Sequence, residues 1–127
     1  MIIGLDHVQL AAPPGCEQAA RDFYGGLLGL AELRKPPVLA ARGGVWFALG
    51  GGQQLHIGVE QAFVPARKAH PALALESPAV LEALAARLER GGCELRWDAE
   101  LPGAMRFYVD DPFGNRLELL ARPAAAD

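Results

Sequence analysis

The sequence predicts an α+β fold built from two tandem β-α-β-β-β modules, each with a four-stranded sheet curved around a shared cup. The first observation is an internal repeat, in which both halves of the chain show the same order of strands, helix and turns. The second is the spacing of polar residues: 49 residues separate His7 from His56, and 48 separate His70 from Glu118. We therefore expect a single domain over residues 1–127, with one module at about 1–60 and the other at about 67–122.

One helix is expected in each half. The first runs from about Cys16 to Leu28, because two prolines and a glycine precede it and Gly29 follows it. The second runs from about Pro78 to Arg90, where Ser77 suits the N-cap and proline suits the first helical position. The apolar residues of this second segment recur at helical spacing, which predicts one buried face.

Four short strands are expected in each half, punctuated by glycine, proline and aspartate. One strand precedes the helix and three follow it. In the first half the predicted strands cover residues 6–10, 30–34, 45–49 and 53–59. In the second half they cover residues 69–73, 94–98, 105–110 and 116–121.

Strand alternation separates two faces in both halves. One face is densely aliphatic, as in Leu55, Ile57 and Val59, and is expected to pack under the helices. The other face is small or polar and is expected to line a cavity. It carries the potential metal ligands His7, His56, His70 and Glu118, together with Gln9, Gln54, Trp46, Arg106 and Tyr108.

The chain has three histidines, and all of them fall on these equivalent cavity positions, with Glu118 at the fourth. Imidazole and carboxylate groups suit a divalent metal such as Zn²⁺, Ni²⁺, Fe²⁺, Co²⁺ or Mn²⁺. A single strand histidine is more often structural, so the joint pattern carries this prediction. His56 is either a fourth ligand or a hydrogen-bond partner of a metal-bound water or substrate.

Three segments resemble the vicinal oxygen chelate superfamily, which includes glyoxalases, bleomycin resistance proteins and dioxygenases. The resemblance covers about Leu5 to Leu120 and is carried by the sequences LDHVQL, DFYGGLLGL and DPFGNRLE, which end at Leu10, Leu30 and Glu118. It implies metal ligands at His7, His70 and Glu118. Glyoxalase I relatives normally have a glutamate at the fourth position, where this chain has His56.

The resemblance also implies a chemistry, in which one metal chelates adjacent oxygens of a small substrate. We expect a metal-dependent, glyoxalase-like lyase, isomerase or thiol transferase, with Glu118 as the candidate base. Arg106, Tyr108, Gln9, Gln54 and Trp46 are candidates to bind and orient the substrate. The alternatives are a non-catalytic binding protein of the bleomycin-resistance type and an iron-dependent dioxygenase.

Composition limits the partners. The net charge of −3 and the estimated pI of 5.6 argue against nucleic acid or an anionic membrane. The N-terminal sequence lacks the pattern of a signal peptide, and no apolar run reaches the ~18 residues of a membrane span. We expect a cytoplasmic homodimer with a small-molecule substrate, in which Cys16 and Cys93 are structural. The linker pair Arg67 and Lys68 is expected to be solvated, or to anchor an anionic substrate group.

Overall fold

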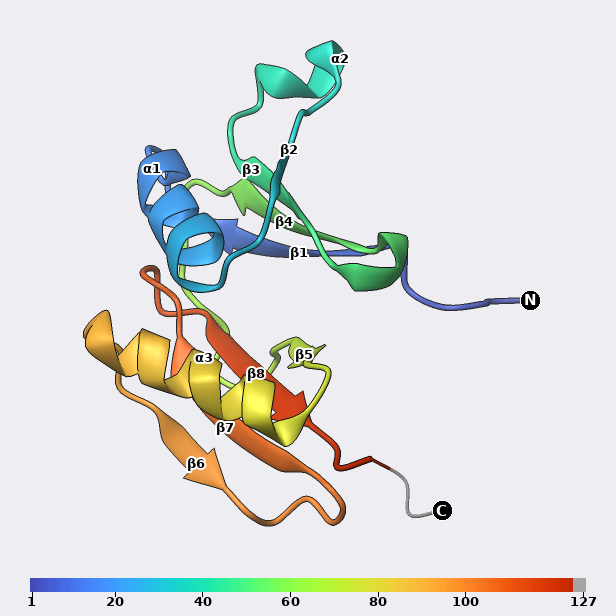
Figure 1. The fold of residues 1–127 in the computed structure, drawn as a ribbon. Coiled ribbons are helices and arrows are strands. Elements are labelled where there is room, and N and C mark those ends of the chain that lie inside the picture. Colours follow the sequence, from blue (N-terminus) through green and yellow to red (C-terminus); the bar gives the residue numbers. More distant parts are fainter. Residues whose placement is uncertain (125–127) are drawn as a thin grey trace. The chain divides into compact units, whose positions relative to one another are not determined.

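The computed structural model describes residues 1–124. It divides the chain into two compact units, Met1–Pro65 and Ala66–Asp127, whose border lies within the predicted linker. Each unit contains one four-stranded mixed sheet and its helices (Figure 1). The predicted α+β class and the two β-α-β-β-β modules are confirmed.

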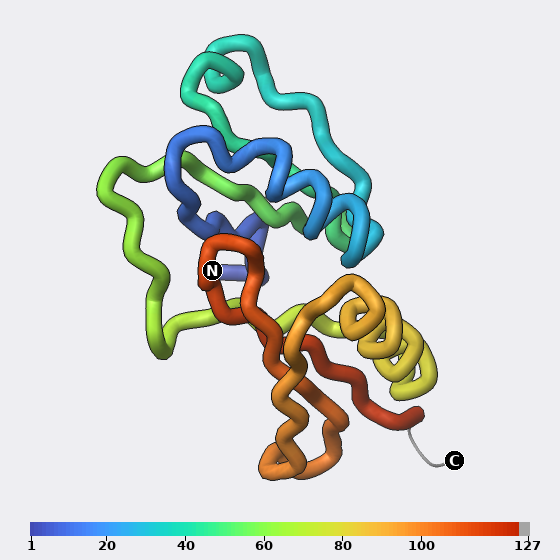
Figure 2. Tube along the Cα trace, turned by 90° about the vertical axis from the view of Figure 1, so that its left-hand side faces the viewer, coloured from blue at the N-terminus to red at the C-terminus, as the bar shows by residue number. Residues whose placement is uncertain are grey.

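The first unit has a sheet in the order β1-β4-β3-β2. In this sheet β1 runs parallel to β4, and the other neighbours are antiparallel. The residues between β2 and β3 make a long excursion that carries α2 (Figures 1 and 2). The elements are β1 His7–Ala12, α1 Glu17–Ala20, the π-helix η1 Arg21–Leu27, β2 Glu32–Leu33, α2 Pro37–Ala40, β3 Val45–Ala48, the 3-10 helix η2 Gly50–Gly52 and β4 Gln54–Val59.

The second unit repeats this arrangement with a sheet in the order β5-β8-β7-β6. Here β5 runs parallel to β8, as β1 does to β4. The helix α3 lies along one face of this sheet and contacts β8 (Figures 1 and 2). The elements are β5 Ala72–Ala74, α3 Pro78–Arg90, β6 Arg96–Asp98, β7 Met105–Asp110 and β8 Arg116–Ala121.

The strand registers support the internal repeat at the level of single residues. His56 lies opposite Gln9 in the first unit, and Glu118 lies opposite Ala72 in the second. Gln9 and Ala72 each come two residues after a histidine, His7 or His70. The two modules therefore place their potential ligands at the same register positions.

Most of the aliphatic face of each sheet forms the core, as predicted, but Val59, which was expected to pack there, is half-buried and lines the cavity described below. In the first unit the ring of Tyr24, from η1, lies 5.6 Å from the ring of Phe47. Burying such rings and aliphatic side chains contributes most of the stabilisation of each unit. The largest fully buried side chains on the strands are Val45, Phe47, Leu55 and Ile57 in the first unit and Phe107, Val109, Leu117 and Leu119 in the second.

The structure corrects three local predictions. The predicted helix over Cys16–Leu28 becomes a short α-helix followed by a π-helix, in which the N–H of Leu28 donates to the carbonyl of Phe23, five residues earlier. Two consecutive glycines in this segment leave room for the wider turn. The short helix α2 was not predicted.

The first strand of the second unit begins later than expected. His70 precedes β5, which covers only Ala72–Ala74. Pro71 has no N–H to donate, and its carbonyl accepts from the N–H of Glu118 instead.

Among the described residues, no helix is long and apolar enough to cross a membrane.

Candidate functional site

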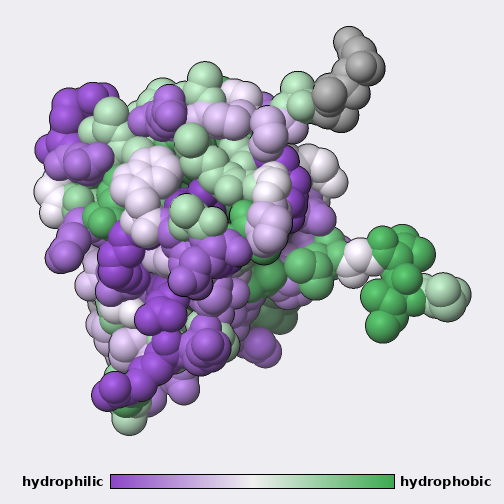
Figure 3. All heavy atoms as spheres, turned by 90° about the horizontal axis from the view of Figure 1, so that it is seen from below, coloured by the Kyte–Doolittle hydropathy of each residue, from purple (hydrophilic) through white to green (hydrophobic). Residues whose placement is uncertain are grey.

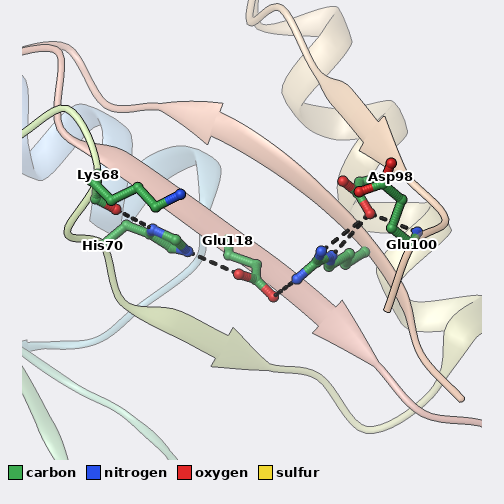
Figure 4. A network of polar contacts seen from close by, with 6 residues as sticks. Lys68, His70, Asp98, Glu100 and Glu118 are labelled. Carbon is green, nitrogen blue, oxygen red and sulfur yellow. Dashed lines mark hydrogen bonds and ion pairs between the residues drawn. The ribbon is translucent and has the colours of Figure 1, made fainter. Parts of the chain in front are cut away.

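A chain of polar contacts links five residues of the second unit (Figure 4). The imidazole of His70 contacts the carbonyl oxygen of Lys68 through Nδ1, at 2.8 Å, and Oε1 of Glu118 through Nε2, at 2.9 Å. The other carboxylate oxygen of Glu118 accepts from Nη1 of Arg106 at 3.1 Å. The Arg106 guanidinium also donates to Oδ1 of Asp98, at 3.1 and 3.3 Å.

These contacts determine where the protons of His70 lie. A carbonyl oxygen can only accept, so Nδ1 of His70 carries the proton that is donated to Lys68. In the neutral ring, Nε2 then presents a lone pair to the Glu118 carboxylate. Two lone pairs at this distance require a cation, which is either a second proton on the ring or a metal ion. Donation of the other ring N–H to a backbone carbonyl is also how metal-binding histidines are usually oriented.

Glu118 is held in a partly desolvated position. Its residue surface is 6% exposed, and each carboxylate oxygen has one partner. Burial raises the pKa of Glu118, but hydrogen bonds from His70 and Arg106 outweigh this effect and the pKa is lowered from its usual 4.5. The carboxylate is therefore ionised at neutral pH, as both a metal ligand and a general base must be.

Tyr108 and Arg106 do not lie as free substrate-binding groups in this unit. The Tyr108 ring packs edge-on against the His70 ring, with centroids 5.4 Å apart. The Arg106 guanidinium lies 5.4 Å from the centroid of the same tyrosine ring and bonds both Asp98 and Glu118. These contacts indicate that Arg106 positions the carboxylate of Glu118.

The first unit brings its two histidines together in an aromatic stack. The His56 ring lies between two others, 3.9 Å from the Trp46 ring and 4.4 Å from the His7 ring, between centroids. The Trp46 and His56 rings are almost parallel, at 2°. Trp46 therefore fixes the orientation of His56, which is only 4% exposed.

The two histidines of this stack differ in the atoms they leave available. Nε2 of His56 contacts Oε1 of Gln54 at 2.8 Å, whereas Nδ1 of His7 contacts the Asp6 carboxylate at 2.8 Å. A carboxylate on Nδ1 places the ring proton there and leaves Nε2 of His7 as a free donor atom for a metal. Burial, reinforced by the nearby His7, lowers the pKa of His56 from 6.5, so this ring is neutral.

A cavity of about 350 Å³ opens on the same face of the first sheet. Its wall includes His7, Gln9, Trp46 and His56, as the strand alternation predicted. Gly58 keeps this space open, because a Cβ there would lie 2.6 Å from Nε2 of Gln9.

Sequence reasoning missed a second part of the wall, which comes from the excursion between β2 and β3. These residues are Lys35, Leu39, Arg42 and Gly43. The sequence carries only a weak signal for this wall: Lys35 precedes Pro36-Pro37 and Arg42 precedes Gly43-Gly44, in a segment without a predicted helix or strand. The linker residues Arg67 and Lys68, which sequence reasoning considered as an anion anchor, are not part of this wall.

The candidate ligands thus form two pairs, His7 with His56 and His70 with Glu118. Over residues 1–124, no three His, Cys, Asp or Glu side chains gather as a metal site. Each pair nevertheless has the donor chemistry that a divalent metal requires. His70 and Glu118 fit best, because Nε2 of His70 and a carboxylate oxygen of Glu118 face each other at 2.9 Å.

Comparisons with known proteins agree with this architecture. Residues 4–119 match the model of the Glyoxalase/Bleomycin resistance protein/Dioxygenase superfamily. A crystal structure of a glyoxalase family protein from Bacillus anthracis shares 48% identity and superposes with a TM-score of 0.90, covering 96% of this chain and 97% of that one. Among curated proteins, no relative matches the chain.

Two more distant structures share the fold. One is a glyoxalase/dioxygenase from Nostoc punctiforme, at 23% identity and a TM-score of 0.78, with 95% of this chain and 92% of that one covered. The other is a fosfomycin resistance protein from Listeria monocytogenes, at 20% identity and a TM-score of 0.72, with 95% and 94% covered.

Proposed function

Because the chain belongs to the glyoxalase/bleomycin resistance protein/dioxygenase superfamily, we propose that it is a metal-dependent, glyoxalase-like enzyme acting on a small oxygenated substrate. The observation that carries the proposal is the contact between His70 and Glu118. Nε2 of His70 faces a carboxylate oxygen at 2.9 Å while its Nδ1 proton is held by a backbone carbonyl. This is the arrangement of a ligand pair oriented before the metal binds.

The proposed ligand set is His7, His70 and Glu118, with His56 as a fourth member. His7 supports this role through its available Nε2. His56 has its Nε2 engaged by Gln54, so it becomes a ligand only if that hydrogen bond is exchanged. Otherwise it orients a water or substrate oxygen. The native ion remains one of Zn²⁺, Ni²⁺, Fe²⁺, Co²⁺ or Mn²⁺.

The bound ion would supply Lewis-acid polarisation of adjacent substrate oxygens. The protein supplies the proton transfer. Glu118 is the proposed base and would accept, on a carboxylate oxygen, a proton from the carbon beside a substrate carbonyl. Arg106 keeps this carboxylate oriented and lowers its pKa, which limits its strength as a base. Gln9 and Trp46 are proposed to contact the substrate, since both line the cavity of the first unit.

Metal binding is the direct test. Purified protein is treated with a chelator, dialysed and titrated calorimetrically with Zn²⁺, Ni²⁺ and Mn²⁺, and its metal content before treatment is measured by mass spectrometry. We expect one ion per chain and at least a tenfold loss of affinity in His7→Ala, His70→Ala and Glu118→Gln. Glu82→Gln, which changes an exposed glutamate of the second unit, is the matched control. Wild-type affinity in all three ligand variants would refute the metal site.

The same preparation separates the alternatives. A binding protein of the bleomycin-resistance type would hold no metal but would retain small molecules. A dioxygenase would consume oxygen with a catechol-type substrate when loaded with Fe²⁺ under reducing conditions. The two histidines and one carboxylate of the proposed set suit Fe²⁺ chemically, so oxygen consumption is measured alongside a glyoxalase-type isomerase assay.

We also propose that the protein is a cytoplasmic homodimer. The N-terminal arm supports a partner surface, because Met1, Ile2 and Ile3 are almost fully exposed and Leu5 is largely so. Figure 3 shows this hydrophobic arm projecting beside a more hydrophilic surface. Light scattering at micromolar concentration should give the dimer mass, and Ile2→Ser with Ile3→Ser should weaken the dimer. A monomer mass for the unmodified chain would contradict the proposal.

A further inference from the structure

We propose that the cavity of the first unit binds the anionic group of the substrate, a carboxylate or phosphonate, through Lys35 and Arg42. This inference rests on the proposed function, because it names the class of small molecule that the enzyme would take. The cavity has a volume of about 350 Å³, which suits a small molecule. Its wall contains His7, His56 and Trp46, so a molecule in it would reach the candidate ligands of this unit.

The charge of the wall favours an anion. Lys35 and Arg42 are its permanently charged residues, and no carboxylate belongs to it. Two acidic residues near the cavity do not line it. The Asp6 carboxylate contacts Nδ1 of His7, and Oε1 of Glu17 would lie 3.3 Å from a Cβ added at Gly43. Neither carboxylate forms an ion pair with Lys35 or Arg42 within the described part of the chain. Two cations without an ion-pair partner in a partly enclosed space attract a negative group.

The two cations are also placed to donate hydrogen bonds. The Lys35 ammonium donates to the carbonyl of Gly43, which holds it beside the cavity and leaves two of its three N–H donors available. Arg42 is exposed, and its side chain has no ion-pair or hydrogen-bond partner among residues 1–124, although its backbone N–H donates to the carbonyl of Leu39. Its guanidinium can therefore donate two parallel hydrogen bonds to a carboxylate or phosphonate.

The remaining wall suits a flat or apolar body attached to the anion. Trp46 provides an aromatic ring, and Leu39, Ile57 and Val59 provide aliphatic surface. Leu39 comes from α2, so the same excursion that carries the two cations also supplies part of the apolar wall. The excursion therefore sets the specificity of this cavity.

Tryptophan fluorescence tests the proposal without any metal present. The chain has two tryptophans, so Trp97→Phe leaves Trp46 as the only reporter. This variant is titrated, in the presence of a chelator, with benzoate, with phenylphosphonate and with benzamide, the neutral counterpart of benzoate. We expect a saturable fluorescence change with the anions and at least tenfold weaker binding of benzamide. Comparing benzoate with phenylphosphonate shows which anion the cations prefer.

Substitutions then assign the effect to the cations. In the same background, Lys35→Met and Arg42→Met should each weaken anion binding by about tenfold or more, the usual effect of losing a charge-assisted hydrogen bond. Arg34→Met is the matched control, since it removes the same charge from the neighbouring residue, which does not line the cavity. Circular dichroism confirms folding of each variant.

Three results would overturn the inference: no saturable change with either anion at millimolar concentration, benzamide binding as tightly as benzoate, or equal losses in Arg34→Met and Arg42→Met. Because a chelator is present throughout the fluorescence titrations, anion binding can be observed even if the calorimetric titration shows no metal binding, and metal binding can be observed even if no anion binds. The two proposals are therefore judged separately.

Discussion

Replacing Glu118 by glutamine distinguishes a metal ligand from a structural ion pair. The amide has the shape of the carboxylate but no charge. In the metal-free protein its NH₂ group can donate to the Nε2 lone pair of His70, while its oxygen still accepts from Arg106, the two contacts that Glu118 makes now. Arg106 also keeps its ion pair with Asp98. Glu118→Gln should therefore fold with its hydrogen bonds intact.

The expected magnitudes follow from these contacts. In the metal-free protein the change exchanges charge-assisted hydrogen bonds for neutral ones, which costs about 1 kcal/mol of unfolding free energy. Breaking a buried ion pair would cost about 3–5 kcal/mol instead. With Zn²⁺ at about 100 times its dissociation constant, the wild type gains about 2.7 kcal/mol. If the variant binds about 100-fold more weakly, it gains only about 0.4 kcal/mol.

Urea unfolding followed by circular dichroism measures both quantities. At a slope of about 1.5 kcal/mol per molar urea, Zn²⁺ should raise the midpoint of the wild type by about 1.8 M and that of Glu118→Gln by about 0.3 M. Glu82→Gln should respond to Zn²⁺ as the wild type does. The reasoning is refuted if Zn²⁺ stabilises Glu118→Gln as much as the wild type. A metal-free loss above about 3 kcal/mol would show that the pair is structural.

The remaining predictions concern the first unit. Burial lowers the pKa of His56, so the neutral ring stabilises the fold fully above pH 6.5, and this contribution is lost as the pH falls below that value. The urea midpoint of the wild type, measured with a chelator present, should therefore decline between pH 7.5 and 5.5. In His56→Gln this decline should be smaller. Burial raises the pKa of Cys16 to about 11 from 9.0, so iodoacetamide at pH 8 should alkylate it about 100-fold more slowly than an ordinary thiol. Mass spectrometry measures the alkylation rate, and a rate equal to that of an ordinary thiol would contradict this prediction. In Gly44→Ala the new Cβ would lie 2.2 Å from the carbonyl oxygen of Ile57 at a φ of +87°, so unfolding should become easier by more than about 3 kcal/mol, whereas Gly50→Ala, which meets nothing within 4 Å, should change stability by less than about 1 kcal/mol.

Alternation along the strands made part of the candidate site predictable. Leu55 and Ile57 flank His56 in β4 and lie on its buried face, so the histidine side chain must point to the opposite face of the sheet. The same reasoning placed Glu118 between Leu117 and Leu119. The structure agrees with both assignments, because all four aliphatic residues lie in the core.

The hydrogen-bond partners of the candidate site residues could not be predicted from strand alternation. Nothing in the sequence pattern indicates that Gln54 engages Nε2 of His56 or that Arg106 bonds both Glu118 and Asp98. Three residues that the sequence predicts to bind substrate make contacts of this kind. Gln54 and Arg106 orient the candidate ligands, and Tyr108 packs against His70.

The sequence by itself determined the two modules and the packed and polar faces of their strands, and it indicated the candidate metal ligands, because strand periodicity and repeat spacing are local properties of the chain. Only the tertiary structure decided which atom of each histidine is available, since that depends on partners such as the carbonyl of Lys68. It also decided that Lys35 and Arg42 line a cavity with Trp46. The two cations lie in an excursion whose sequence has no strand or helix periodicity that would predict its backbone path. The Lys35 side chain joins its two ends through the carbonyl of Gly43, a contact that only the folded chain reveals.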